Sequence, residues 1–164
     1  MDKIPLDGDW DLAYFPEGEI EPEEIVRSNG EVLKWIKARV PGNCQLDLMR
    51  EGKLPDPYVG LNARKFREQE FYEWWYRRKF ILEDELKGKR LELLFEGIDT
   101  FATIWLNGRL IGKTRNMFIP YSFDITEDVK FGEENILLIR IQPADLCVRG
   151  KDLNGTYDVM HSYE

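Results

Sequence analysis

The fold of this chain is decided by the stretch Phe101-Ala102-Thr103-Ile104-Trp105-Leu106-Asn107-Gly108-Arg109-Leu110-Ile111-Gly112. Its first half, residues 101–106, has the pattern of a strand. The pair Asn107-Gly108 that follows tolerates a positive φ at both central positions of a type I′ turn, which joins two antiparallel strands tightly. We therefore predict a hairpin in which the strand 101–106 turns back directly into a second strand that starts at Arg109.

Alternation of apolar and polar residues, which is typical of half-buried strands, recurs on both sides of this hairpin. It predicts further strands at residues 6–15, 35–40, 74–81, 91–96, 119–125 and 135–142. The last of these is apolar on both faces for most of its length and is expected at the centre of a sheet. Pro120 cannot donate a backbone hydrogen bond, so it is expected at an edge or a bulge.

Seven or eight short strands with one or two brief helices predict an all-β fold, an antiparallel β-sandwich of two packed sheets. One helical turn is expected after Pro22. A second short helix is expected to be capped by the side chain of Asn43 and to end at Gly52. The residues expected on its covered side are Leu46, Leu48 and Met49.

Two segments lie outside this pattern. Residues 52–69 contain two prolines and many polar groups, and they are expected to form a long ordered loop whose length suggests a function. Residues 145–164 lose the alternation. We therefore divide the chain into a sandwich domain, residues 1–144, and a tail or linker, residues 145–164.

The composition excludes several classes of function. The 164 residues carry a net charge of −8, and no Lys and Arg cluster suited to nucleic acid is present. No apolar run predicts a membrane span, and the first residues lack the apolar core of a signal peptide. Cys44 and Cys147 lie far apart and His161 is the single histidine, so no metal and no cofactor are predicted. The expected location is the reducing cytoplasm.

No nucleophile motif, phosphate-binding glycine loop or zinc-binding motif occurs. Glycosidases can act with two carboxylates alone, which leaves acidic residues as candidates. Those nearest the aromatic strands are Glu70, Glu73, Glu96 and Asp99. Because acids that alternate with apolar residues normally face water, we predict no catalytic residue in this chain.

Trp74 and Trp75 are adjacent in a predicted strand, so their side chains point to opposite faces and only one can enter the core between the sheets. The other would be exposed, where it could stack on a sugar ring, or covered by a connection such as residues 52–69. Burial is the favoured interpretation, and both residues are retained as candidate aromatic contacts with sugar.

Several motifs resemble a known family. The strings Val40-Pro41-Gly42-Asn43-Cys44-Gln45-Leu46-Asp47-Leu48 and Leu54-Pro55-Asp56-Pro57-Tyr58-Val59-Gly60-Leu61-Asn62 resemble the N-terminal domain of β-mannosidases. The similarity continues through residues 72–77, 95–108 and 116–121, and it covers about residues 10–142. The stretch before the Asn-Gly hairpin is shared across glycoside hydrolase family 2, whereas the Pro-Asp-Pro-Tyr loop narrows the resemblance to mannosidases.

The resemblance implies a galactose-binding-like jelly roll, often labelled sugar-binding, that precedes an immunoglobulin-like domain and a catalytic (β/α)₈ barrel. The two catalytic glutamates belong to that barrel, which 164 residues do not contain. The Trp-Asp motif with which such domains usually reach toward the substrate would lie beyond Glu164. We therefore expect a piece of a family 2 glycoside hydrolase that is inactive alone. Its implied partners are the rest of its own polypeptide and the terminal sugar of a β-mannoside.

In this family, loops of the domain lean over the mouth of the barrel. The matching loop is residues 55–62, so the resemblance predicts that Asp56 and Asn62 face the active-site entrance, as hydroxyl ligands or as groups that hold the loop. Alternatively, both side chains only satisfy backbone groups in Asx turns. Two other functions stay open, an autonomous carbohydrate-binding module and an interaction domain unrelated to sugar. The residues do not decide between a β-mannosidase, a β-galactosidase and a β-glucuronidase as the parent enzyme.

Overall fold

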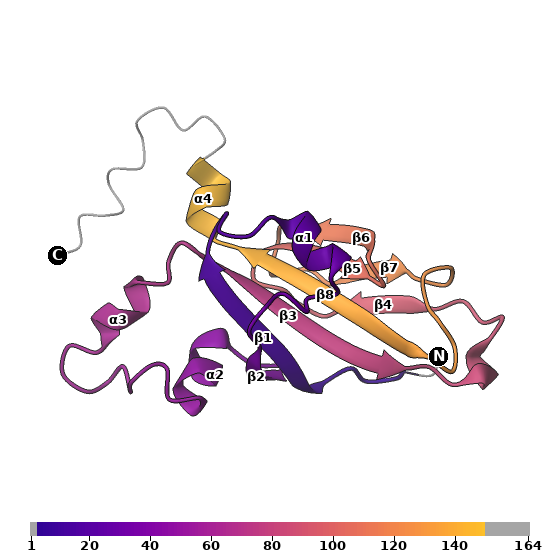
Figure 1. Ribbon diagram of the computed structural model, residues 1–164, viewed down its shortest axis with the longest axis horizontal. Coiled ribbons are helices and arrows are strands. Elements are labelled where there is room, and N and C mark those ends of the chain that lie inside the picture. Colours follow the sequence, from indigo (N-terminus) through magenta and orange to yellow (C-terminus); the bar gives the residue numbers. More distant parts are fainter. Residues whose placement is uncertain (1–2, 150–164) are drawn as a thin grey trace.

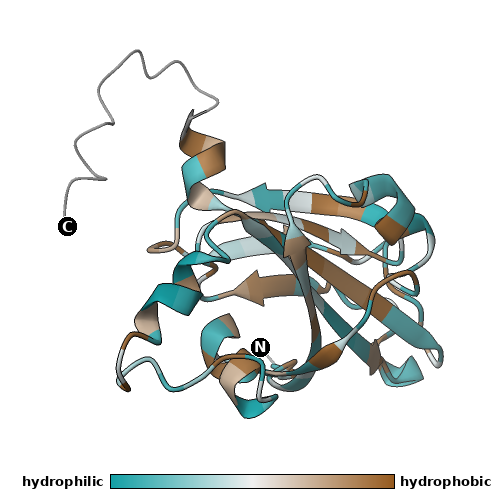
Figure 2. Ribbon diagram, turned by 60° about the vertical axis from the view of Figure 1, so that its left-hand side comes forward, coloured by the Kyte–Doolittle hydropathy of each residue, from teal (hydrophilic) through white to brown (hydrophobic). Residues whose placement is uncertain are grey.

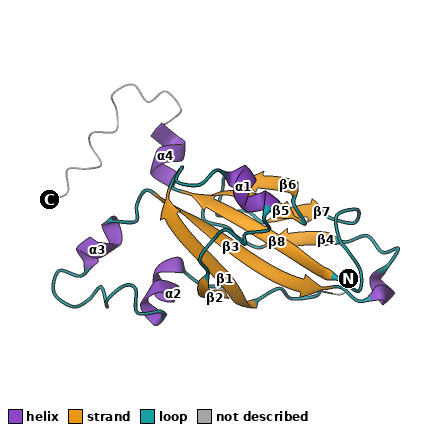
Figure 3. Ribbon diagram, viewed as in Figure 1, coloured by secondary structure: helices purple, strands orange, loops and turns teal. Residues whose placement is uncertain are grey.

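The computed structural model describes residues 3–149 as a sandwich of two antiparallel sheets, with short helices at its margins (Figures 1 and 3). Its strands are β1 (Gly8–Pro16), β2 (Ile36–Val40), β3 (Tyr72–Ile81), β4 (Glu92–Phe95), β5 (Phe101–Leu106), β6 (Arg109–Thr114), β7 (Tyr121–Asp124) and β8 (Glu134–Gln142). Its helices are α1 (Pro22–Arg27), α2 (Cys44–Arg50), α3 (Ala63–Arg67), α4 (Ala144–Arg149) and the 3₁₀ helix η1 (Asp84–Leu86).

The predicted all-β antiparallel sandwich is confirmed. Six strands form one sheet in the order β2-β1-β3-β8-β5-β6, and β4 pairs with β7 in the second sheet. Strand β8, expected at the centre because it is apolar on both faces, lies between β3 and β5. Pro120 directly precedes β7, so its missing N–H interrupts no ladder.

The predicted hairpin between β5 and β6 is also confirmed. Leu106 pairs with Arg109 across the turn. The φ angles of Asn107 and Gly108 are 52° and 83°, as a type I′ turn requires. The Asn107 side chain adds a tertiary contact, because its Oδ1 accepts the backbone N–H of Ile136 at 3.0 Å. The turn is therefore tied to β8 as well as to its own strands.

Both faces of the six-stranded sheet are buried. Figure 2 shows hydrophobic residues, coloured brown, in its strands. One face packs on β4 and β7 and forms what we call the inter-sheet core. The buried members of the inter-sheet core are Trp10, Leu12, Ala38, Leu93, Ile98, Ala102, Ile104, Leu106, Ile125, Leu137 and Ile139. The opposite face is covered by residues 17–35 and forms the outer core. Its buried members are Ala13, Phe15, Ile25, Leu33, Trp75 and Leu138.

Charged side chains border the outer core in paired form. Glu73 is fully buried, and its carboxylate accepts hydrogen bonds from Arg140 Nε at 2.7 Å and from the indole N–H of Trp75 at 2.9 Å. Arg77 lies 4.4 Å above the Trp35 ring and pairs with the carboxylate of Asp11 at 3.0 Å. Because each buried charge has a partner, it does not carry the full cost of desolvation.

Both expected helical segments are confirmed, and the structure adds to them. Besides α1 and α2, the described residues contain α3, α4 and η1. Residues 52–69 are therefore not loop throughout, since α3 lies within them. Helix α4 begins at Ala144 and crosses the boundary we drew between residues 144 and 145. The remainder of the predicted tail, residues 150–164, lies outside the described residues.

Helix α2 has the predicted ends but not the predicted covered face. Asn43 Oδ1 accepts the backbone N–H groups of Gln45 at 2.9 Å and of Leu46 at 3.3 Å, as expected of an N-cap. Gly52 follows the helix with φ 68°. The expectation that Leu46 is covered was wrong, because Leu46 is 49% exposed while Leu48 is fully buried. The inward face is instead set by residues 44, 47 and 48, which recur with the helical period.

Candidate functional site: an apolar rim

One end of the sandwich gathers loops that are distant in sequence. At this end β3 begins, β8 ends, β5 begins and β6 ends, because Phe101 pairs with Gln142 and Ala102 pairs with Thr114. The connection that enters β3 and the connection that leaves β6 therefore lie at the same end of the sheet. We call these two segments, residues 55–71 and 115–120, the apolar rim.

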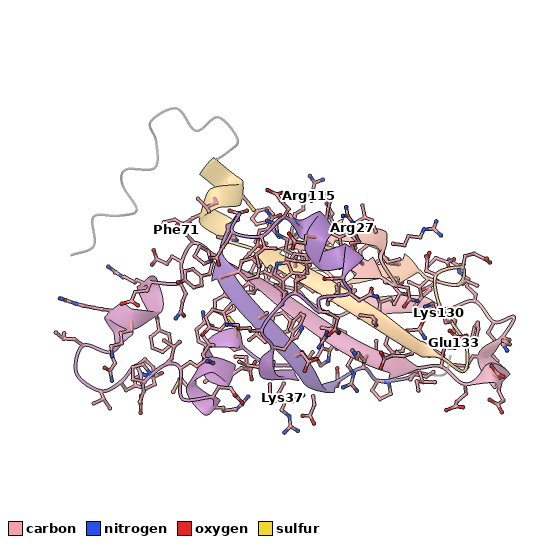
Figure 4. The ribbon with its side chains drawn as sticks, viewed as in Figure 1. Arg27, Lys37, Phe71, Arg115, Lys130 and Glu133 are labelled. Atoms are coloured by element: carbon pink, nitrogen blue, oxygen red, sulfur yellow. The ribbon has the colours of Figure 1, made fainter. Side chains whose placement is uncertain are left out.

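The apolar rim holds more than half of the large hydrophobic side chains that the described residues expose. Its exposed members are Tyr58 (95%), Val59 (60%), Leu61 (70%), Phe71 (42%), Met117 (39%), Phe118 (85%) and Ile119 (46%). Figure 4 shows Phe71 near the end of the sheet from which α4 leaves. Scattered single apolar residues are normal on protein surfaces, whereas several at one end of the domain make the rim a candidate contact surface.

The loop of residues 55–62 is held by its own polar groups. Asp56 Oδ1 accepts the backbone N–H of Tyr58 at 2.9 Å, which is an Asx turn. Asn62 Nδ2 donates to the backbone oxygen of Asp56 at 3.0 Å. Among the described residues, Asp56 Oδ2 and Asn62 Oδ1 have no hydrogen-bond partner. The structure thus brings the two predicted side chains together. In each, one polar atom is hydrogen-bonded to the backbone of the loop and the other has no partner among the described residues.

The tryptophan pair divides between the two cores, as the strand geometry predicted. Trp74 is half-buried on the side of the inter-sheet core and stacks on Tyr14 with ring centroids 5.3 Å apart. Trp75 is fully buried in the outer core and stacks on Trp105 at 5.4 Å. Residues 17–35 cover Trp75, rather than the connection 52–69 that we suggested. Trp75 therefore has no exposed surface to offer a sugar within this domain.

The acidic candidates do not assemble a site. Glu73 is occupied by Arg140 and Trp75, as described above. The carboxylate of Glu96 lies 4.0 Å from Lys3 at the surface, and the carboxylate of Asp99 accepts a hydrogen bond from the neighbouring Thr100 hydroxyl. Glu70 is exposed. In residues 3–149 no group of three or more His, Cys, Asp and Glu side chains could hold a metal ion.

The chain between β2 and residues 55–71 of the apolar rim is attached to the sheet through α2. Asp47 is 1% exposed, and its Oδ1 accepts the backbone N–H of Arg39 in β2 at 3.3 Å and a hydrogen bond from Arg50 at 2.7 Å. Burial raises the pKa of Asp47. The hydrogen bond from the Arg39 backbone and the charge of Arg50 lower this pKa, but they offset only part of the increase. Burial also raises the pKa of the nearby, partly buried Cys44 thiol to about 11, so this thiol is protonated at neutral pH.

The comparison with known families identifies this arrangement. Residues 23–158 match the family described as the glycosyl hydrolase 2 galactose-binding domain-like family. The chain belongs to this family. A β-mannosidase B of Thermothelomyces thermophilus is 33% identical over 145 residues, which cover 87% of this chain and 15% of that protein. A β-mannosidase of Bos taurus is 41% identical over 120 residues, which cover 73% of this chain and 13% of that protein.

Solved structures of family members agree with this assignment. The crystal structure of a β-D-mannosidase from Dictyoglomus thermophilum superposes with a TM-score of 0.79 at 37% identity, over 96% of this chain and 18% of that one. A β-glucuronidase of Lactobacillus rhamnosus gives a TM-score of 0.59 at 27% identity, over 84% of this chain and 20% of that one. The chain therefore spans less than a fifth of the β-mannosidases named here.

The sequence pattern did not predict one half of the apolar rim. Residues 117–119 were assigned in part to a strand, because Ile119 continues the alternation of β7. In the structure, Asn116 Oδ1 accepts the N–H of Phe118 at 2.9 Å and turns the chain before β7 begins. Three consecutive apolar residues ahead of a proline interrupt a period of two, and this interruption was the available signal.

No helix among residues 3–149 has the length and apolar character needed to cross a membrane.

Proposed function

We propose that this chain is the non-catalytic N-terminal domain of a β-mannosidase-type glycoside hydrolase, and that it shapes the entrance to an active site on a catalytic barrel. The observation that carries this proposal is the apolar rim, combined with the family assignment and the small share of each relative that the chain covers. Identity to β-mannosidases of 33% and 41%, against 27% for a β-glucuronidase, favours a terminal mannose residue as the sugar at that entrance.

The rim has the chemistry of a docking surface for the rest of the polypeptide. Side chains such as Leu61 and Phe118 each contribute about 1.5–3 kcal/mol when they pass from water into a fully buried contact. Helix α3 adds basic residues, which form no ion pair within the described part of the chain. They are Arg64, Lys65 and Arg67. The complementary surface on the partner is therefore expected to be apolar at its centre and acidic at its margin.

In this arrangement the loop of residues 55–62 reaches past the docked surface toward the sugar. Tyr58 and Leu61 anchor it in the interface, while Asp56 Oδ2 and Asn62 Oδ1 remain available to accept hydrogen bonds from sugar hydroxyls. Holding the loop and binding the substrate are compatible roles, because each side chain has one polar atom for each. The chain alone is proposed to catalyse no hydrolysis, since the four acidic candidates among the described residues, Glu70, Glu73, Glu96 and Asp99, are paired or exposed singly.

The test uses the full-length polypeptide that carries this domain, with a nitrophenyl β-mannoside as substrate. Asp56→Ala and Asn62→Ala should each lower kcat/KM about tenfold, because each removes one hydrogen bond to the sugar, and should change the melting temperature only slightly, because the loop bonds they also remove are exposed. Glu133→Ala, an exposed acid at the other end of the sheet (Figure 4), is the matched control and should change neither quantity. A lower melting temperature with unchanged kinetics would assign Asp56 and Asn62 to holding the loop alone.

A further inference from the structure

A groove lies between α1 and the hairpin of β5 and β6. It is open to solvent and has a volume of about 290 Å³, close to the lower limit of small-molecule sites. Its apolar surface comes from Trp105, Leu110 and Val26, and Glu23 and Arg27 of α1 also line it. Figure 4 shows Arg27 on this helix. Trp105 precedes the hairpin turn, which stands at the end of the sheet opposite the rim.

The Trp105 ring is held so that one face is available to the groove. Trp75 stacks on Trp105 with an interplanar angle of 15° and a centroid distance of 5.4 Å. Trp75 is itself fully buried, and its indole N–H is bonded to Glu73 at 2.9 Å. Because this pair fixes the orientation of Trp105 and covers one face of its ring, the face that the groove can use is the opposite one. An aromatic platform that is already ordered loses little side-chain entropy when a ligand binds.

The two charged side chains of the groove have no partner among residues 3–149. Glu23 and Arg27 are exposed, and neither makes a hydrogen bond or an ion pair with any described residue. They lie four residues apart on α1, on one side of the helix. A carboxylate only accepts hydrogen bonds and a guanidinium only donates them. A ligand that satisfies both must therefore present donors and acceptors side by side.

We propose that this groove binds one neutral pyranose residue of a saccharide, at a site separate from the entrance loop. A pyranose has an apolar C–H face that stacks on an indole ring, and hydroxyl groups at its edge that donate to Glu23 and accept from Arg27. A ligand with a single charge would be attracted by one of Glu23 and Arg27 and repelled by the other, so a net charge brings no advantage in this groove. An apolar peptide side chain would remove both charges from water without supplying partners, which is costly.

This site goes beyond the proposed function. The entrance loop meets the sugar that the parent enzyme cleaves, whereas the groove would hold a second sugar residue at the opposite end of the domain. The groove would thus retain a polysaccharide or glycan chain near the enzyme. A single half-buried indole ring with two polar contacts at the edge of the sugar predicts weak binding, with a Kd on the order of 1 mM.

The experiment is a saccharide titration of the chain with all five tryptophans labelled as 5-fluorotryptophan. The probes are β-1,4-mannobiose and cellobiose, and the readout is the ¹⁹F spectrum, assigned with single Trp→Phe variants. The resonance of Trp105 should shift saturably. Glu23→Gln and Arg27→Gln should each weaken binding about tenfold, because each removes a charged hydrogen-bond partner. Glu24→Gln, on the same helix but outside the groove, should leave binding unchanged.

Three outcomes would overturn the proposal. One is the absence of any saturable shift up to about 50 mM saccharide, far above the expected Kd. Another is a shift of the Trp74 resonance while Trp105 stays in place, which would move the sugar to the rim side of the domain. The last is a concentration-dependent dimer that Leu110→Asp abolishes, since the groove would then belong to a second copy of the chain. None of these outcomes bears on the kinetics of the Asp56 and Asn62 variants, so the two proposals fail independently.

Discussion

Two long connections leave the same sheet, and they differ in whether their apolar side chains are buried or exposed. Residues 17–35 join β1 to β2, carry α1, and bury Ile25 and Leu33 over the outer core. Residues 41–71 join β2 to β3, carry α2 and α3, and leave Tyr58, Val59 and Leu61 exposed. Both contain a short helix and comparable apolar residues. The difference shows that the first connection completes the fold, while the second holds apolar surface that the domain itself does not use.

The tertiary contacts of each connection explain this difference. Arg77 of β3 reaches the first connection through a hydrogen bond to Glu31 at 2.9 Å and lies over the Trp35 ring. The second connection is attached near its start, through Asp47 and Leu48 of α2. Beyond Leu54, its loop of residues 55–62 is stabilised mainly by its own turns.

The largest expected effect compares an apolar residue of each connection. Ile25→Ala should lower the free energy of unfolding by about 2–5 kcal/mol, because Ile25 is fully buried and its removal leaves a cavity. Val59→Ala should cost about 0.5 kcal/mol or less, because Val59 is 60% exposed. Urea unfolding followed by tryptophan fluorescence measures both. Similar losses for the two variants would mean that the second connection belongs to the folding core.

A smaller effect compares two asparagines within the second connection. Asn43→Ala should cost about 1 kcal/mol, because its side chain caps α2 with bonds to two backbone N–H groups. Asn62 precedes α3 with helical backbone angles and makes no capping bond, so Asn62→Ala should cost only a few tenths of a kcal/mol. The same unfolding measurement applies. An equal cost at both positions would contradict the view that only α2 is anchored.

The smallest effect concerns the pH dependence of the α2 anchor. Burial raises the pKa of Asp47 above its ordinary value of 3.8, so the folded state favours the protonated form. The stability contributed by this shift is fully present below pH 3.8 and is lost as the pH rises through the folded pKa. Relative to Asp47→Asn, which stays neutral, the wild-type domain should therefore lose stability as the pH rises above 3.8 and passes through the raised pKa of Asp47.

Urea midpoints of the wild type and Asp47→Asn at several pH values across this range provide the measurement. The difference between the two proteins should change in one direction, with the wild type relatively more stable at the acidic end. A difference that is constant with pH, or that favours the wild type more strongly at neutral pH, would show that Asp47 is ionised in the folded domain and stabilised by Arg50.

Much of the fold followed from local chemistry. Alternation placed the strands, the Asn107-Gly108 pair predicted the hairpin, and Asn43 and Gly52 marked the ends of α2. The errors at single residues concern which side chains are buried, because tertiary packing decides this where the local pattern allows more than one answer. Leu46 was assigned to the covered face of α2, although the helix turns Cys44 and Leu48 inward instead. Likewise, the pattern could not show that residues 17–35 cover Trp75.

The candidate sites divide in the same way. The resemblance pointed to Asp56 and Asn62, and the structure adds that the two side chains brace one loop. Neither the apolar rim nor the groove beside Trp105 could be found from one segment alone. Each combines segments that are distant in sequence and that only the folded sheet brings together. In addition, the identity of a single apolar residue does not tell whether its side chain is exposed to solvent.

The sequence by itself determined the class of fold, the central position of β8 and the family. The first two follow from periodicity and turn-forming residues, which depend only on neighbouring positions in the sequence. The family follows from motifs that are visible in the sequence itself. Only the tertiary structure decided which apolar residues close the cores and which remain exposed. The physical reason is that burial depends on what packs against a side chain. Ile25 and Ile119 show this: Ile25 is 0% exposed because it packs in the outer core, whereas Ile119, at the apolar rim, is 46% exposed.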